Sequence, residues 1–169
     1  MRLALFAVVA FFSAMIGVPG AAQAQLAVSR SPAAAPTLGN TTRPSTATTF
    51  QISTAGVVTR LSGDAVRLSN TSVTTPTITV SCGIIGICLR NLRVVVTPVT
   101  SSGTASIVRL RASSFSGATM TSGTTEGATL DFTLGQMLLS HITFKLGMDV
   151  RLAAGATGPQ TFDYHVSVT

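Results

Sequence analysis

The sequence has little charge and few aromatic side chains. Only 9% of its 169 residues are charged and 5% are aromatic, with no Trp and a single Tyr. Disordered chains combine high charge with low hydrophobicity, whereas 46% of this chain is hydrophobic, so the composition indicates a folded domain. The ten Arg residues are scattered, without a basic run or interleaved aromatic residues. This spacing argues against a nucleic-acid partner, because such binding surfaces gather cations and stacking rings.

Catalytic motifs are also scarce. The chain has two His and five acidic residues, and no Gly-x-Ser-x-Gly motif, phosphate-binding glycine loop or metal-ligand spacing. His141 follows Ser140, but adjacency alone does not make a catalytic pair. Glu126 and Asp131 are two carboxylates of the kind that glycosidases use, yet nothing in the pattern joins them. We therefore expect no catalytic, cofactor-binding or metal-binding residues and no cofactor, and a secreted hydrolase is the weakest hypothesis.

The first 24 residues have the parts of a secretory signal peptide. Arg2 supplies the basic start, residues 3–18 are apolar, and Ala22-Gln23-Ala24 offers the small residues of a cleavage site. Pro19 ends the apolar run before it reaches the ~20 residues that span a membrane. We expect export to the periplasm, the cell surface or the exterior, and no transmembrane segment after cleavage.

The chain has only two cysteines, and both lie beyond the signal peptide. Cys82 and Cys88 flank a short segment with two glycines, between stretches that look like strands. In an oxidising compartment such a pair is expected to form a disulfide, which stabilises a loop of this size by about 2 kcal/mol. An unpaired state and a redox or metal role are the alternatives, although redox pairs are usually separated by two residues rather than five.

Residues 25–45 differ in composition from the rest of the exported chain. They are rich in Ala, Ser and Thr and contain three prolines, which predicts a flexible arm or linker before a folded domain at 46–169. An extended arm could add a strand to a neighbour's sheet, but the prolines make it a poor donor. Whether the arm is donated stays open.

Beyond Thr46, short apolar runs alternate with Gly, Ser, Asn and Pro. Thr and Ser together account for 44 residues, a composition typical of strands rather than amphipathic helices. The pattern predicts an all-β fold, an antiparallel sandwich or barrel. The expected strands are 48–53, 57–61, 65–69, 76–82, 89–98, 105–112, 129–134, 142–146, 148–152 and 161–168, with a Gly/Thr loop at 122–127.

The C-terminal strand has the clearest alternation. Phe162, Tyr164, Val166 and Val168 share one face, and the residues between them are polar. Such a period of two predicts one buried face and one wet face. We select these four residues as a candidate assembly strand.

Three stretches carry a resemblance to a known family. They are Gly56–Thr59, Pro76–Val80 and Phe144–Val168, the last of which joins a Gly-containing strand, an Ala/Gly turn and an aromatic-alternating strand. On these stretches the chain, from about Phe50 onward, resembles a family of bacterial secreted proteins, domain of unknown function 4402. That family is similar to spore-coat-U-like and fimbrial subunits. The resemblance implies an immunoglobulin-like, pilin-like β-sandwich without enzymatic activity; the cysteine pair is a departure from the family's pattern.

Two functional hypotheses follow. The first is an exported, non-enzymatic β-sandwich that acts as a cell-surface or pilus-like structural subunit or adhesin, whose partners are further copies or other envelope and surface subunits. The alternative is a periplasmic or extracellular module that binds a ligand or glycan, which would require a concave site. Few aromatic residues are available to build such a site.

Overall fold

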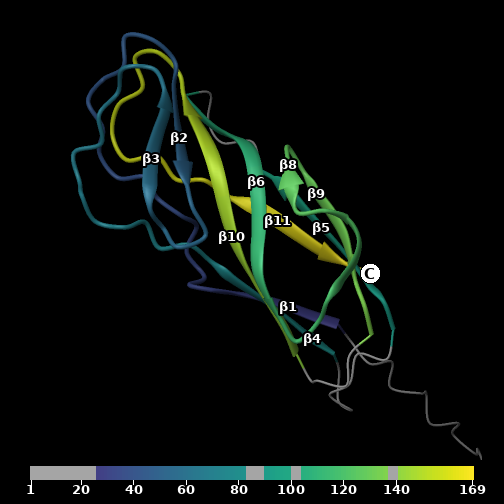
Figure 1. Cartoon of the computed structure of the whole chain (residues 1–169). Helices are drawn as coiled ribbons and strands as arrows, with labels where there is room; N and C mark the ends of the chain where they lie inside the picture. Colours follow the sequence, from purple (N-terminus) through teal and green to yellow (C-terminus); the bar gives the residue numbers. More distant parts are fainter. Residues whose placement is uncertain (1–25, 83–89, 100–103, 137–140) are drawn as a thin grey trace, which may run out of the picture.

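The computed structural model describes residues 26–82, 90–99, 104–136 and 141–169. These residues form an all-β structure in which two antiparallel sheets pack together as a β-sandwich (Figure 1). The fold class predicted from the sequence is therefore confirmed. Within the described ranges, no helix has the length and apolarity needed to cross a membrane. The expected signal peptide, residues 1–24, lies outside these ranges and stays a prediction.

One long strand, β10 (His141–Leu152), organises the larger, seven-stranded sheet. One edge of β10 pairs with β6, while the first half of its other edge pairs with β4 and the second half with β2. Two edge strands, β1 and β3, therefore lie toward opposite ends of β10 (Figure 1). The other strands of this sheet are β1 (Leu26–Ser31), β2 (Thr48–Ile52), β3 (Val58–Ser62), β4 (Thr77–Cys82), β6 (Ala105–Ser116) and the two-residue β8 (Glu126–Gly127).

The smaller sheet has four strands in the order β11-β5-β9-β7, all antiparallel to their neighbours. Its edges are thus β11 and β7, and β11 crosses behind β6 and β10 in Figure 1. The strands are β5 (Leu92–Pro98), β7 (Met120–Thr124), β9 (Leu130–Leu134) and β11 (Tyr164–Val168).

Three phenylalanines join the two sheets in the core. Phe115 on β6 and Phe144 on β10 contact Phe132 on β9 edge-to-face, with ring centroids 5.5 Å apart in both pairs. The Phe115 and Phe144 rings are stacked at 5.8 Å. Each such contact adds about 0.5–1.5 kcal/mol to the stabilisation from burial alone. Because the rings come from both sheets, this cluster fixes how the sheets face one another.

The sequence predicted two strands, 142–146 and 148–152, where the structure has the single strand β10. Gly147 separates the two predicted strands. In the structure Gly147 stays in the strand because the segment after β2 crosses it closely. A Cβ atom at this position would lie 2.9 Å from both the Ile52 carbonyl oxygen and the Thr54 nitrogen. The glycine therefore admits a neighbouring backbone and does not end the strand.

Two other predictions, a strand at 65–69 and a loop at 122–127, were wrong. The expected strand 65–69 is irregular apart from an isolated bridge between Arg67 and Thr41. Conversely, the expected loop at 122–127 contains part of β7 and the whole of β8. All five residues of β7 are exposed, so this strand has no alternation of apolar and polar residues for the sequence to display.

Residues 26–45, which we expected to form a flexible arm, pack against the sandwich. β1 pairs with β4 along six residues, and Leu38 is completely buried. The Phe162 N–H donates to the Pro36 carbonyl at 2.9 Å. Pro32 follows β1 and does not interrupt it, so the prolines are compatible with this pairing.

Candidate functional site

The four residues selected as a candidate assembly strand face the interior. Phe162 and Tyr164 are buried, while Val166 and Val168 are half-buried and pack against the core. Phe162 precedes β11, which begins at Tyr164, so the strand is shorter at its start than the predicted 161–168. Burial alternates as far as His165, after which Val166, Ser167 and Val168 are all half-buried.

The backbone pairing of β11 leaves one of its edges open. Its neighbour in the smaller sheet is β5, where Thr169 and Arg93 exchange two backbone hydrogen bonds of 2.9 and 3.0 Å. In an antiparallel pair, such bonded positions recur at every second residue. The N–H and C=O groups of Tyr164, Val166 and Val168 therefore point away from β5.

The chain itself already uses the beginning of this edge. The Leu38 N–H donates to the Gln160 carbonyl at 3.0 Å, and Thr37 forms an isolated bridge with Thr161. These contacts, with the Pro36–Phe162 bond, place the segment after β1 alongside the residues that lead into β11. In the part of the chain that the structure describes, no strand continues this pairing along Tyr164–Val168.

A shallow groove separates β11 from β1. Its volume is about 390 Å³. Arg30 of β1 bridges it, donating to the Asp163 carboxylate at 2.6 Å and lying 5.4 Å from the centroid of the Tyr164 ring. The exposed side chains of Val28 and Val99 add apolar surface to the groove. We call this the β1–β11 groove.

Ion pairing perturbs the titration of the groups in the β1–β11 groove. The hydrogen bond from Arg30 lowers the pKa of Asp163, partly opposed by desolvation. The same bond raises the pKa of Arg30. Burial raises the pKa of Tyr164. All these shifts maintain the ion pair and a neutral phenol at ordinary pH, so the groups hold β1 against β11 and offer no catalytic acid or base.

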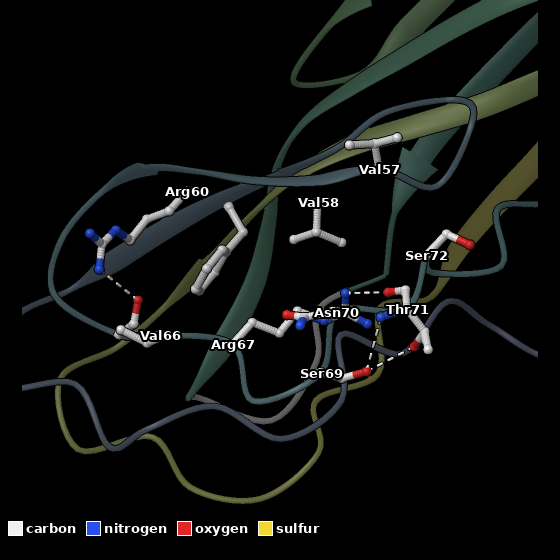
Figure 2. Close-up of a pocket in the computed structure, with 11 residues that line it drawn as sticks. Val57, Val58, Arg60, Val66, Arg67, Ser69, Asn70, Thr71 and Ser72 are labelled. Atoms are coloured by element: carbon white, nitrogen blue, oxygen red, sulfur yellow. Dashed lines mark hydrogen bonds between the residues drawn. The ribbon is translucent and has the colours of Figure 1, made fainter.

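A second hollow, which we call the β3 groove, lies between β3 and the irregular segment 65–72 (Figure 2). Its volume is about 480 Å³. It exists because β3 lies at the outer end of the larger sheet, where loop segments rather than the second sheet cover the inner face. Leu38, Ala65 and Val73 come from such segments and join Phe50 and Ile52 of β2 in the core.

Two arginines line the β3 groove and are held by backbone carbonyls. The Arg60 Nη1 donates to the Ala65 carbonyl at 3.1 Å. Arg67 donates through Nε to the Leu38 carbonyl at 2.7 Å and through Nη1 to the Thr71 carbonyl at 2.5 Å. In Figure 2, Arg60 reaches toward Val66, whereas Arg67 runs toward Asn70 and Thr71.

No carboxylate lines the β3 groove in the described residues. The nearest acidic residue in the sequence, Asp64, is engaged elsewhere. Its carboxylate accepts hydrogen bonds from the backbone N–H and the hydroxyl of both Ser45 and Thr46. These bonds, the Ser45 hydroxyl first, lower the pKa of Asp64 far below its ordinary value. The Asp64 carboxylate therefore fixes two loops to one another, while the Asp64 backbone carbonyl accepts a hydrogen bond of 3.5 Å from Arg60 Nη1.

Sequence analysis missed the β3 groove. Arg60 and Arg67 were read as members of a scattered set, and 65–69 was assigned to a strand. A local signal was present, because Val57, Val66 and other large apolar residues interrupt a polar stretch without forming a regular pattern. The structure leaves Val57 58% and Val66 52% exposed, and Leu61 and Leu68 in the same stretch are exposed as well.

The structure describes only some of the remaining residues considered from the sequence. Cys82 ends β4 and is buried, but Cys88 lies outside the described residues, so the disulfide stays a prediction. His165 lies on the wet face of β11. Ser140, the neighbour of His141, also lies outside the described residues. Across the described ranges, no group of three or more His, Cys, Asp or Glu side chains could hold a metal ion.

The two candidate glycosidase carboxylates are both ion-paired. Asp131 accepts two hydrogen bonds from Arg93, at 2.9 and 2.6 Å, and the pKa of Asp131 is lowered as a result. Glu126 pairs with Arg109 at 2.9 Å and with Arg111 at 3.0 Å. A carboxylate with a lowered pKa is a poor general acid at neutral pH. The lowered pKa thus argues against Asp131 as a general acid, while Glu126 is held by two arginines.

Comparison of the chain with family models, with curated proteins and with solved structures found no match. The resemblance to the secreted family therefore stays a prediction, and function has to be argued from the two grooves and the open edge.

Proposed function

We propose that this chain is an exported, non-enzymatic subunit of a cell-surface assembly, in which an extended strand of a second copy pairs with the open edge of β11. Adding a strand to a sheet edge is a common mode of protein recognition, since backbone hydrogen bonds supply affinity and side-chain pockets supply specificity. The half-buried Val166 and Val168 and the adjoining β1–β11 groove would supply the apolar contacts.

A comparison of the edge strands carries the proposal. Natural sheets protect their edges with charged residues, prolines or bulges. The edge strand β1 is protected by Arg30 and by Pro32, which follows it. β3 is protected by Arg60 and by a register shift against β2, and β7 by a register shift against β9. β11 pairs with β5 in unbroken register and contains no Lys, Arg or Pro. β11 is the edge strand least protected against pairing.

A proline substitution tests the role of the edge. Val166→Pro removes an N–H that points away from β5, so pairing within the subunit is retained while the edge loses a donor. Val166→Ala is the control, because it also replaces the branched valine side chain but keeps the N–H. Both variants and the wild-type chain would be exported from a bacterial host and compared by light scattering and negative-stain microscopy.

The proposal predicts concentration-dependent multimers or filaments for the wild-type chain and Val166→Ala, and monomers for a folded Val166→Pro. Monomers of the wild-type chain at every concentration would refute self-assembly, as would assembly of Val166→Pro equal to that of Val166→Ala. The N-terminal sequence of the exported protein checks the expected cleavage before Gln25.

The alternative function, a ligand- or glycan-binding module, is favoured by a different observation. It requires a concave site, and the β3 groove is concave, lined by both apolar and polar groups, and large enough for a small ligand.

A further inference from the structure

We infer that the β3 groove is a binding site for an acidic saccharide, a short chain of sugars that carry carboxylates. The groove belongs to the seven-stranded sheet, whereas the edge proposed for assembly belongs to the four-stranded sheet. A test of this inference is therefore independent of a test of the assembly proposal.

Charge is the first argument. Arg60 and Arg67 line the groove and no carboxylate in the described residues lines it with them. Four arginines outside the groove are paired with acids, in the pairs Arg30–Asp163 and Arg93–Asp131 and in the pairs of Arg109 and Arg111 with Glu126. A groove with two uncompensated guanidinium groups attracts an anion, and the planar N–H fork of arginine suits a carboxylate.

The arrangement of the two arginines indicates more than one negative charge on the ligand. Arg60 and Arg67 reach toward different ends of the groove (Figure 2). Each guanidinium is oriented by a backbone carbonyl, yet has five N–H donors, so donors remain for a ligand. Because the carbonyl bonds already restrict the side chains, binding would cost less conformational entropy. Two positioned cations match successive acidic sugars better than a single anion.

The rest of the lining suits a hydroxylated ring. Val57, Val58 and Val66 present aliphatic surface that can contact the C–H face of a sugar. Ser69, Asn70, Thr71 and Ser72 place hydroxyl and amide groups along the opposite wall, where they can exchange hydrogen bonds with sugar hydroxyls. An acidic peptide would satisfy the arginines but would make less use of this polar wall, so the structure favours the saccharide.

Trigalacturonate is a suitable probe, and its fully methyl-esterified form is the matched neutral control. Titration calorimetry of the exported chain at low ionic strength should show saturable binding of trigalacturonate and at least about tenfold weaker binding of the ester. Salt at about 0.5 M should weaken the binding of trigalacturonate, because screening acts on exposed charges. Triglutamate serves as the acidic peptide and should bind more weakly than the saccharide.

Two pairs of variants locate the site. Arg60→Gln should weaken trigalacturonate binding about tenfold, the usual effect of losing a charged hydrogen bond. Arg151→Gln, at an exposed arginine of β10 outside the groove, should leave binding within about twofold of the wild type. Val57→Asp places a negative charge on the groove wall and should also weaken binding. Val108→Asp, the same change at an exposed valine on β6, is its control and should weaken binding less. Val57 is exposed, so this pair keeps the test valid if Arg60→Gln does not fold.

Four results would overturn the inference. They are the absence of trigalacturonate binding at 10 mM, equal binding of the methyl ester, tighter binding of triglutamate, and equal losses in the groove variants and their controls. Equal losses would mean that the net positive charge of the chain attracts the saccharide without a defined site.

Discussion

β10 and β11 have the same kind of sequence pattern and very different places in the molecule. In both strands, apolar residues alternate with other residues, and in both the apolar positions face the core. β10 has paired strands along both edges and six completely buried residues on its inner face. β11 is paired on one edge, and its last two apolar residues are only half-buried.

The comparison shows what an alternation of apolar and polar residues indicates about a strand. It reports which face of a strand is buried, because side chains point alternately to the two faces. It does not report how many neighbours a strand has, because every residue has a backbone carbonyl acceptor and every residue except proline has an N–H donor. β10 therefore lies in the middle of its sheet, while β11 combines a core face with an open edge.

The largest difference between the two strands should appear on their inner faces. Phe144→Ala on β10 should lower the free energy of unfolding by about 3–5 kcal/mol, because it leaves a cavity among three packed rings. Val166→Ala on β11 should cost only about 1 kcal/mol, since this valine is half-buried. Urea unfolding of the two variants measures both values. Similar losses would contradict the contrast between a central and an edge strand.

The outer faces allow a second comparison, between two aspartates that each pair with an arginine. The Asp149 side chain on β10 is 7% exposed and pairs with Arg111, whereas the Asp163 side chain before β11 is 49% exposed and pairs with Arg30. Asp149→Asn should destabilise the fold by about 3 kcal/mol, because it leaves a partly buried cation with a weaker partner. Asp163→Asn should cost less than about 1 kcal/mol, because solvent screens the exposed pair. Thermal and urea unfolding would test this order, and a larger loss for Asp163→Asn would reverse our interpretation.

The smallest expected effect is a local loosening of β1 in acid. The pKa of Asp163 is lowered in the folded protein, so its ion pair contributes fully above the ordinary carboxyl value of 3.8. The contribution is lost as the pH falls below that value and through the lowered pKa. Amide exchange in β1, corrected for its intrinsic pH dependence, should therefore accelerate as the pH falls from about 5 to about 2 more than exchange in β4, which contains no acidic or basic residue. Asp163→Asn should remove this pH dependence. If the variant keeps it, another carboxylate is the cause of the pH dependence.

The candidate sites could be predicted from the sequence only in part. The burial of Phe162 and Tyr164 could be predicted because their neighbours in the sequence are polar. The β3 groove could not be predicted, since Arg60 and Arg67 are seven positions apart and become part of one lining only when segment 65–72 folds against β3. The sequence did not predict the strand β1 either, because the proline-rich composition of residues 25–45 obscures a six-residue strand that ends just before Pro32.

The sequence by itself determined the all-β class and the inward face of the strands with a buried side, since both follow from composition and from a period of two. Only the tertiary structure decided which strands lie at edges, that Gly147 admits a crossing backbone, and that two arginines share a groove without a carboxylate. The physical reason is that burial leaves a local pattern in side-chain type, whereas strand pairing and close backbone approach join residues far apart in the chain through groups that nearly every residue has.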